Sequence, residues 1–196
     1  SSQGPTSDNR IKPDVLAPGY FIESADSVGY HDTQTCNSAY MAGTSMATPM
    51  VASAAALVKA KFPLYTMQQV GEQLRITSDN IDNKNPDYLS LLGKGRLNVF
   101  RAITETSPSI RNQHLTLVDK ANGSILAGDT LKIFFDLKNF LSPTAGLIMN
   151  LSTNNPNVEL LDNQLNIGFL NTLETKTQLG PFRVVIKSEI TDNEVV

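Results

Sequence analysis

The stretch Gly43-Thr44-Ser45-Met46-Ala47-Thr48-Pro49 opens a run that decides the fold of the first half of this chain. From Met46 to Val58 there is no charged residue, and five positions are alanine. A helix that is apolar on all sides is typical of a buried position, and alanine lets neighbours pack closely. Lys59 and Lys61 then complement the negative end of the helix dipole, and Pro63 marks a stop. The pattern predicts a buried helix that begins at about Ser45.

Ser45 is the candidate nucleophile of this stretch. A serine hydroxyl needs an activating base and a site free of its own backbone, and Gly43 permits such close approach. At a helix N-terminus the backbone N–H of Ser45 could face a developing oxyanion. Pro49 is compatible with this helix if it lies in the first turn, where its missing N–H has no intrahelical partner. The alternative interpretation is that Gly-Thr-Ser merely caps an alanine-rich helix.

Two further blocks flank this stretch in the first half of the chain. Ser1-Ser2-Gln3-Gly4-Pro5 and Lys12 to Gly19 precede it, and Gly93 to Ile103 follows it. Together the three blocks resemble the C-terminal part of the catalytic domain of subtilisin-like serine proteases (subtilases, peptidase family S8). The resemblance covers about residues 1–106 and implies an α/β fold. It also implies that Ser45 is the catalytic nucleophile, and that Thr44 and Gly43 belong to the oxyanion hole and substrate cleft.

The resemblance predicts a serine endopeptidase that acts on polypeptide substrates, but the chain lacks recognisable partners for Ser45. In subtilases the triad runs Asp, His, Ser along the chain. Neither the aspartate, the histidine nor the oxyanion asparagine has a matching segment here, and His31, fourteen positions before Ser45, fits no catalytic motif. We therefore expect the missing N-terminal part of the catalytic domain to be the first partner of this chain, and residues 1–196 alone to be inactive. The alternative is a non-catalytic pseudo-protease or an extracellular binding or attachment module.

Shorter patterns predict the scaffold between these blocks. Thr66-Met67-Gln68-Gln69 has the form of a capping box, with Val70 and Leu74 on one face of the helix that follows. Residues 78–86 are polar and rich in turn formers, which indicates a surface loop. Asn98 is placed to cap a short helix over residues 99–104.

The second half, residues 107–196, changes from helical to alternating patterns. Apolar and polar residues alternate around 115–117, 131–137, 147–151 and 182–186, with turn signals at Asn122-Gly123, Asn155-Pro156-Asn157 and Gly180-Pro181-Phe182. This spacing predicts an antiparallel β-sandwich accessory domain. Because the sequence stops inside what resembles a new strand, we expect the sandwich to be incomplete.

Composition narrows the classes of partner and site. The net charge is −3 with no basic block, which argues against nucleic-acid binding, and no run is long enough to span a membrane. Cys36 is the single cysteine, so no disulfide forms within the chain; it is either a buried small hydrophobe or the partner of a cysteine elsewhere. Asp119, Asp129 and Asp162 do not have the spacing of a compact calcium loop, so no metal or cofactor is assigned. The family resemblance alone implies calcium sites in other segments of a parent protein, and a secreted or cell-surface location.

Overall fold

The computed structural model describes residues 4, 6–7, 10–25, 38–119 and 126–187. It divides the chain into two compact units, Ser1–Thr106 (unit 1) and Ser107–Val196 (unit 2). The architecture is mixed α/β with antiparallel sheets. Among the described residues, no helix combines the length and apolar character that a membrane crossing requires.

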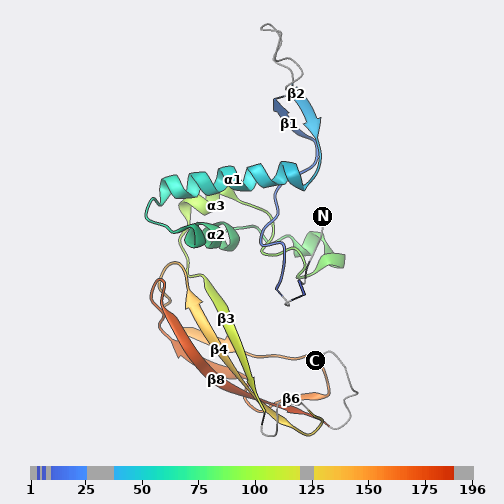
Figure 1. Cartoon of the computed structure of the whole chain (residues 1–196), viewed down its shortest axis with the longest axis vertical. Coiled ribbons are helices and arrows are strands. Elements are labelled where there is room, and N and C mark those ends of the chain that lie inside the picture. The colour runs from blue at the N-terminus through green and yellow to red at the C-terminus, as the bar shows by residue number, and fades with distance from the viewer. Residues whose placement is uncertain (1–3, 5, 8–9, 26–37, 120–125, 188–196) are drawn as a thin grey trace. The chain divides into compact units, whose positions relative to one another are not determined.

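Unit 1 is a small helical cluster with one β-hairpin at the N-terminal end of its longest helix (Figure 1). In chain order its elements are β1 (Ile22–Ala25), β2 (Ser38–Met41), α1 (Thr44–Lys61), α2 (Met67–Ile76), the 3₁₀ turns η2 (Asp82–Lys84) and η3 (Pro86–Tyr88), and α3 (Val99–Thr104). Strands β1 and β2 pair antiparallel, with Ile22 opposite Met41.

The three helices of unit 1 share one hydrophobic cluster. It joins α1, α2 and α3 through five buried side chains: Ala54, Val58, Val70, Leu74 and Ala102. The capping box is confirmed, because the Thr66 hydroxyl accepts a hydrogen bond from the Gln69 N–H while the Gln69 side chain accepts one from the Thr66 N–H. The predicted cap of α3 is also confirmed, with the Asn98 side chain accepting from the N–H of Arg101 at 3.0 Å.

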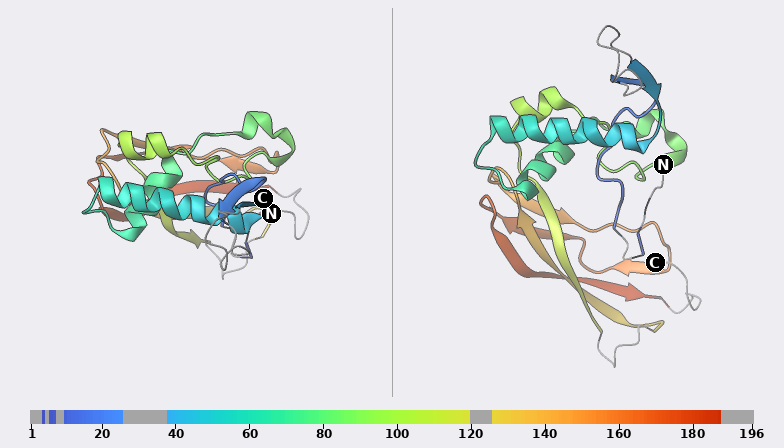
Figure 2. Two further views of the ribbon diagram at one scale, coloured as in Figure 1. Left: turned by 90° about the horizontal axis from the view of Figure 1, so that it is seen from above. Right: turned by 45° about the horizontal axis from the view of Figure 1, so that its top comes forward.

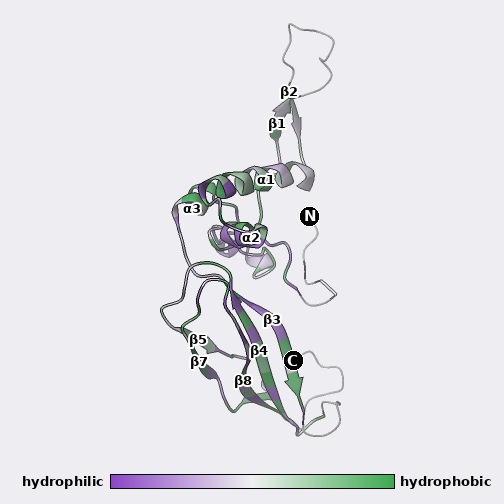
Figure 3. Ribbon diagram, turned by 60° about the vertical axis from the view of Figure 1, so that its left-hand side comes forward, coloured by the Kyte–Doolittle hydropathy of each residue, from purple (hydrophilic) through white to green (hydrophobic). Residues whose placement is uncertain are grey.

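Helix α1 agrees with the predicted helix in extent but not in burial. Only Ala54 and Val58 are buried within it, whereas Met50 and Leu57 are 40% and 52% exposed. Figure 3 shows how little polar colour the helix carries before its final lysines. Within unit 1, α2 and α3 supply its packing partners, so its remaining face stays open.

Unit 2 consists of two antiparallel sheets (Figure 2). The larger has the strand order β3-β4-β8-β6, and the smaller pairs β5 with β7. The strands are β3 (Ile110–Val118), β4 (Thr130–Asn139), β5 (Leu147–Asn150), β6 (Val158–Leu160), β7 (Gln164–Gly168) and β8 (Thr175–Ile186).

Side chains from both sheets of unit 2 meet in one apolar cluster. Phe135 and Phe182 from the larger sheet pack edge to face, with ring centroids 5.8 Å apart. Ile167 of β7 and Leu147 of β5 join the same cluster. The alternating patterns at 131–137, 147–151 and 182–186 therefore correspond to strands whose apolar side chains pack inside unit 2. The pattern at 115–117 also forms a strand, β3, but its Leu115 and Leu117 are exposed.

The three turn predictions for unit 2 have different outcomes. Asn155-Pro156-Asn157 is a turn, in which the Asn155 side chain accepts a hydrogen bond from the N–H of Asn157. The prediction at Gly180-Pro181-Phe182 is wrong, because these residues lie inside β8 at a point where its pairing with β4 shifts register. Glycine and proline occur at such irregularities as well as in turns. Asn122-Gly123 falls outside the described residues.

Candidate active site

Ser45 lies exposed in the first turn of α1, immediately after a sharp change of backbone direction. Gly43 makes that change with φ 144° and ψ 169°, a conformation that residues with a side chain rarely adopt. Its carbonyl accepts hydrogen bonds from the N–H groups of Met46 and Ala47, which close the turn. No side chain caps the helix at Gly43, so the turn is held by backbone groups.

The start of α1 corrects the predicted place of Pro49. The helix begins at Thr44, so Pro49 lies inside it and not in its first turn. The N–H that proline lacks would have bonded to the carbonyl of Ser45, four residues earlier. The hydroxyl of Thr48 donates to the Thr44 carbonyl at 2.9 Å and so satisfies one of the neighbouring acceptors. The candidate nucleophile therefore stands in a turn with an interrupted helical ladder.

Ser45 is well placed for electrostatic assistance. The first N–H groups of a helix have no intrahelical acceptor, and the helix dipole is positive at this end. A negative charge that develops on an oxygen near Ser45 would be stabilised by both. Thr44 and Gly43 lie beside it in the chain, but their individual roles are expectations carried over from the resemblance.

A shallow pocket of about 340 Å³ adjoins Ser45 within unit 1. Residues of β1, β2 and the first turns of α1 line it: Ile22, Ser24, Ala25, Ala39, Met41, Ser45, Met46 and Pro49. None of these side chains carries a charge. The described part of the pocket therefore offers Ser45 an uncharged, mostly apolar setting.

The structure does not bring a base to Ser45. His31 and Cys36 lie outside the described residues, so their predicted roles stay untested. His114 is exposed on β3 in unit 2, where it pairs in register with Asp136. The described residues thus present the candidate nucleophile without a general base.

Asp129 and Asp162 of unit 2 each have partners within the protein. Asp129 accepts a hydrogen bond from the N–H of Leu126, and Asp162 forms an ion pair with Arg183 at 2.9 Å. Hydrogen bonds from Arg183 lower the pKa of Asp162. Over the residues that the structure describes, no group of three His, Cys, Asp or Glu side chains could hold a metal ion.

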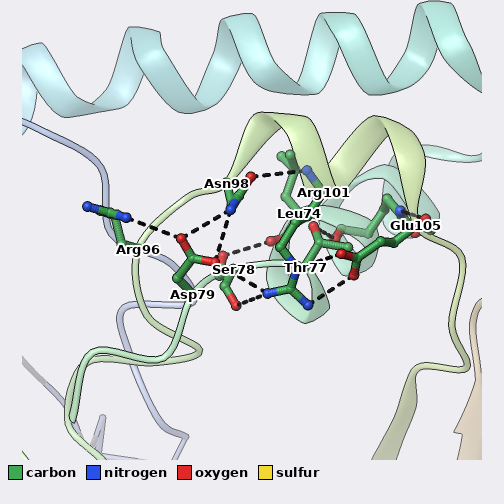
Figure 4. Close-up of polar contacts among 9 residues, drawn as sticks. Leu74, Thr77, Ser78, Asp79, Arg96, Asn98, Arg101 and Glu105 are labelled. Atoms are coloured by element: carbon green, nitrogen blue, oxygen red, sulfur yellow. Dashed lines mark hydrogen bonds and ion pairs between the residues drawn. The ribbon is translucent and has the colours of Figure 1, made fainter. Parts of the chain in front are cut away.

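A polar network joins the segment after α2 to the start of α3 (Figure 4). The carboxylate of Asp79 accepts hydrogen bonds from Asn98 at 3.0 and 3.1 Å and from Arg96 at 3.2 Å. These bonds, that from Asn98 first, lower the pKa of Asp79. Arg101 contacts Asp79 at 3.4 Å and holds the Glu105 carboxylate with two further bonds. Asp79, the second residue of the segment predicted as a surface loop (78–86), is therefore firmly anchored.

Sequence reasoning did not single out Asp79 or the contact of Gly19 with Gly43. An aspartate in a polar stretch looks like any solvated turn residue, and no local pattern in the block that ends at Gly19 marks a contact with Gly43. A hydrogen bond that joins two segments twenty-four residues apart leaves no local periodic signal. Only the resemblance of the whole block to a family pattern hinted that the segment matters.

Comparison with known proteins places this geometry in context. Residues 1–95 match the family model described as "Subtilase family". Serine protease AprX of Bacillus subtilis is 37% identical over 110 residues, which cover 53% of this chain and 24% of AprX. Subtilisin E of the same organism is 42% identical over 89 residues, covering 45% of this chain and 20% of the relative. The serine protease/ABC transporter B family protein tagD of Dictyostelium discoideum is 41% identical over 68 residues, 30% of this chain and 4% of the relative.

The matched stretch is thus less than a quarter of each of these relatives. The stretch that matches the family model contains strands β1 and β2, the Gly-Thr-Ser turn and helices α1 and α2. Residues 1–95 of this chain therefore form a subtilisin-like serine protease region, which is similar to the subtilase family over the stretch that matches.

Proposed function

We propose that residues 1–106 form the C-terminal part of the catalytic domain of a serine endopeptidase, with Ser45 as its nucleophile. The observation that carries this proposal is the exposed Ser45 at the start of α1, directly after the Gly43 turn and inside the region that matches the subtilase family. Its hydroxyl would attack the scissile carbonyl of a polypeptide substrate and form an acyl-enzyme. The N–H of Ser45 would donate to the oxyanion, with Thr44 and Gly43 shaping the cleft beside it.

The remaining catalytic groups would come from a longer polypeptide that includes this chain. A histidine would accept the proton of Ser45 and then deliver it to the leaving amine, and an aspartate would orient that histidine. The open face of α1 supports this view, because Met50 and Leu57 are exposed in a helix that carries no charged side chain from Met46 to Val58. The preceding part of the domain would cover that face and bring the base to Ser45.

Unit 2 is proposed to be an accessory β-sandwich, residues 107–196, attached to the protease domain. The apolar cluster shared by side chains of its two antiparallel sheets supports this assignment. A secreted or cell-surface location is part of the proposal and rests on the family resemblance alone.

Labelling with a fluorophosphonate tests the proposal, because such reagents react with a serine only when an assembled site activates it. The longer polypeptide would be labelled, digested and analysed by mass spectrometry. We expect the adduct on Ser45, its loss in Ser45→Ala, and its retention in Ser53→Ala, the matched control for an exposed serine of the same helix. Fragment ions must separate the two serines, since no lysine or arginine lies between them.

The opposite result is equally informative. A folded, mature polypeptide that takes no label at Ser45 would refute the protease assignment. It would favour the alternative of a non-catalytic pseudo-protease or an extracellular binding module.

A further inference from the structure

Gly19 touches the turn that carries the proposed nucleophile. Its carbonyl accepts a hydrogen bond from the N–H of Gly43 at 2.6 Å. A Cβ built on Gly19 would lie 2.7 Å from the carbonyl oxygen of Gly43 and 3.3 Å from the Cβ of Ala47. The nearer neighbour is backbone, which cannot rotate away as a side chain can. A side chain at position 19 therefore requires the backbone to shift where Gly19 meets the Gly43 turn.

The segment that ends at Gly19 is itself anchored only three residues earlier. The N–H of Leu16 donates to the Gly95 carbonyl at 2.8 Å, and the Leu16 carbonyl accepts from the N–H of Leu97 at 2.7 Å. Arg96, between these two partners, exchanges two backbone hydrogen bonds with Asp79, each 2.8 Å long. The short stretch from Leu16 to Gly19 is thus fixed at both ends, and it connects the polar network of Figure 4 to the turn before Ser45.

No side chain caps α1 at Gly43, so no capping contact can take the place of the bond from Gly19. The backbone bond from Gly19 instead restrains the residue that sets the direction of the first turn. The position of the Ser45 hydroxyl follows that direction, since Ser45 is only two residues further along.

We propose that Gly19 is a positioning residue, which holds the Gly43 turn so that the Ser45 hydroxyl points along its line of attack. This inference rests on the proposed function for its catalytic consequence, but the restraint on the turn is independent of it. A misplacement of about 1 Å at a reacting atom is enough to lower a rate by about 10²-fold. Gly19 does not touch the substrate in this scheme; it acts through Gly43.

The test compares Gly19→Ala with Gly71→Ala in the longer polypeptide. Gly71 lies in α2, and a Cβ there meets nothing within 4 Å, so it is a matched glycine without a neighbour to displace. Three quantities would be measured: the rate of fluorophosphonate labelling at Ser45, kcat and KM for a peptide substrate, and amide hydrogen exchange of peptides that cover residues 43–47. For Gly19→Ala we expect a fall of about 10- to 100-fold in kcat and labelling rate with little change in KM. Exchange over residues 43–47 should accelerate, whereas Gly71→Ala should match the wild type in all three.

The outcomes separate this inference from the proposed function. Wild-type labelling, kcat and exchange in Gly19→Ala would overturn it, as would a uniform increase of exchange across unit 1 without a local excess at the turn. If the wild type takes no label, the proposed function fails, and exchange over residues 43–47 alone decides whether Gly19 restrains the turn. If Gly19→Ala does not fold, Ala47→Val is the second variant, because it places a larger side chain of α1 against Gly19. The same changes in local exchange and in kcat are expected.

Discussion

Asn139 shows how much one side chain can organise in this protein. It is fully buried at the end of β4 and uses both ends of its amide group. Its oxygen accepts from the N–H groups of Ser109 and Leu141, and its NH₂ group donates to three carbonyls, those of Ser142, Leu170 and Asn171. A buried polar group is tolerated only when its partners are present, and here one amide ties together three separate stretches of backbone.

The substitution Asn139→Asp tests this role at the scale of a single residue. It keeps the shape of the side chain but presents a carboxylate oxygen to three carbonyl oxygens. We expect unit 2 to lose about 3 kcal/mol or more of unfolding free energy, since buried acceptors lose their donor and a charge is buried. Urea unfolding followed by far-ultraviolet circular dichroism, which reports the β-structure of unit 2, measures the change. Asn166→Asp, on the partly exposed β7, is the control, and an equal loss in both variants would contradict the assignment.

At the scale of elements, α2 and α3 are joined by polar contacts as well as by the apolar cluster. The buried Gln73 of α2 donates to the carbonyls of Ala102 and Glu105, and Asp79 links the segment after α2 to Arg96 and Asn98. These contacts set the position of α3 and of the stretch that precedes it. That stretch pairs with Leu16 through backbone hydrogen bonds, and Gly19, three residues further along, bonds to Gly43. The packing of α2 and α3 is therefore linked to the Gly43 turn.

The pH dependence of unit 1 should reveal the contribution of Asp79. Its pKa is lowered from the ordinary 3.8, chiefly by the hydrogen bond from Asn98, so the ionised carboxylate stabilises the folded state. That stabilisation is fully present above 3.8 and is lost as the pH falls through the lowered pKa of the folded state. Asp79→Asn should therefore be less stable than the wild type at neutral pH, and the difference should close below pH 3.8.

Urea unfolding at a series of pH values measures this difference directly. The exposed Asp87 of η3 provides the control, and Asp87→Asn should follow the wild-type curve. A gap between Asp79→Asn and the wild type that stays constant down to the lowest pH would contradict the assigned role.

At the scale of the whole molecule, the two units depend differently on what surrounds them. The apolar interior of unit 2 is made by its own sheets, with Phe182 and Leu170 fully buried. Unit 1 has a cluster on one side of α1 and leaves an apolar face of that helix exposed. An uncharged helix face of this kind is stable when another element covers it.

We therefore predict that residues 1–196 alone do not hydrolyse peptide bonds, whereas a longer polypeptide with the preceding part of the domain does. The described residues provide no base for Ser45, and an unactivated serine hydroxyl is a poor nucleophile. A fluorogenic peptide mixture measures hydrolysis in both samples, and Ser45→Ala of the longer form corrects for contaminating proteases. Turnover by the 196-residue chain that Ser45→Ala abolishes would disprove the prediction.

The sequence by itself determined the features that short-range patterns encode. The apolar run after Ser45 specified α1, Thr66 and Gln69 specified the start of α2, and alternating residues specified the strands of unit 2. Periodicity and capping act over a few residues, so they can be recognised without knowing the fold. The three motif blocks also pointed to the subtilase family, which the match over residues 1–95 supports.

Tertiary structure alone decided how distant segments meet. It placed Gly180-Pro181 inside β8, because pairing with β4 determines whether such a dipeptide is a turn or a local irregularity. It also brought Gly19 against Gly43 and gave Asp79 and Asn139 their partners. These contacts join residues that are far apart in the chain, and their geometry exists only once the intervening helices and strands have packed.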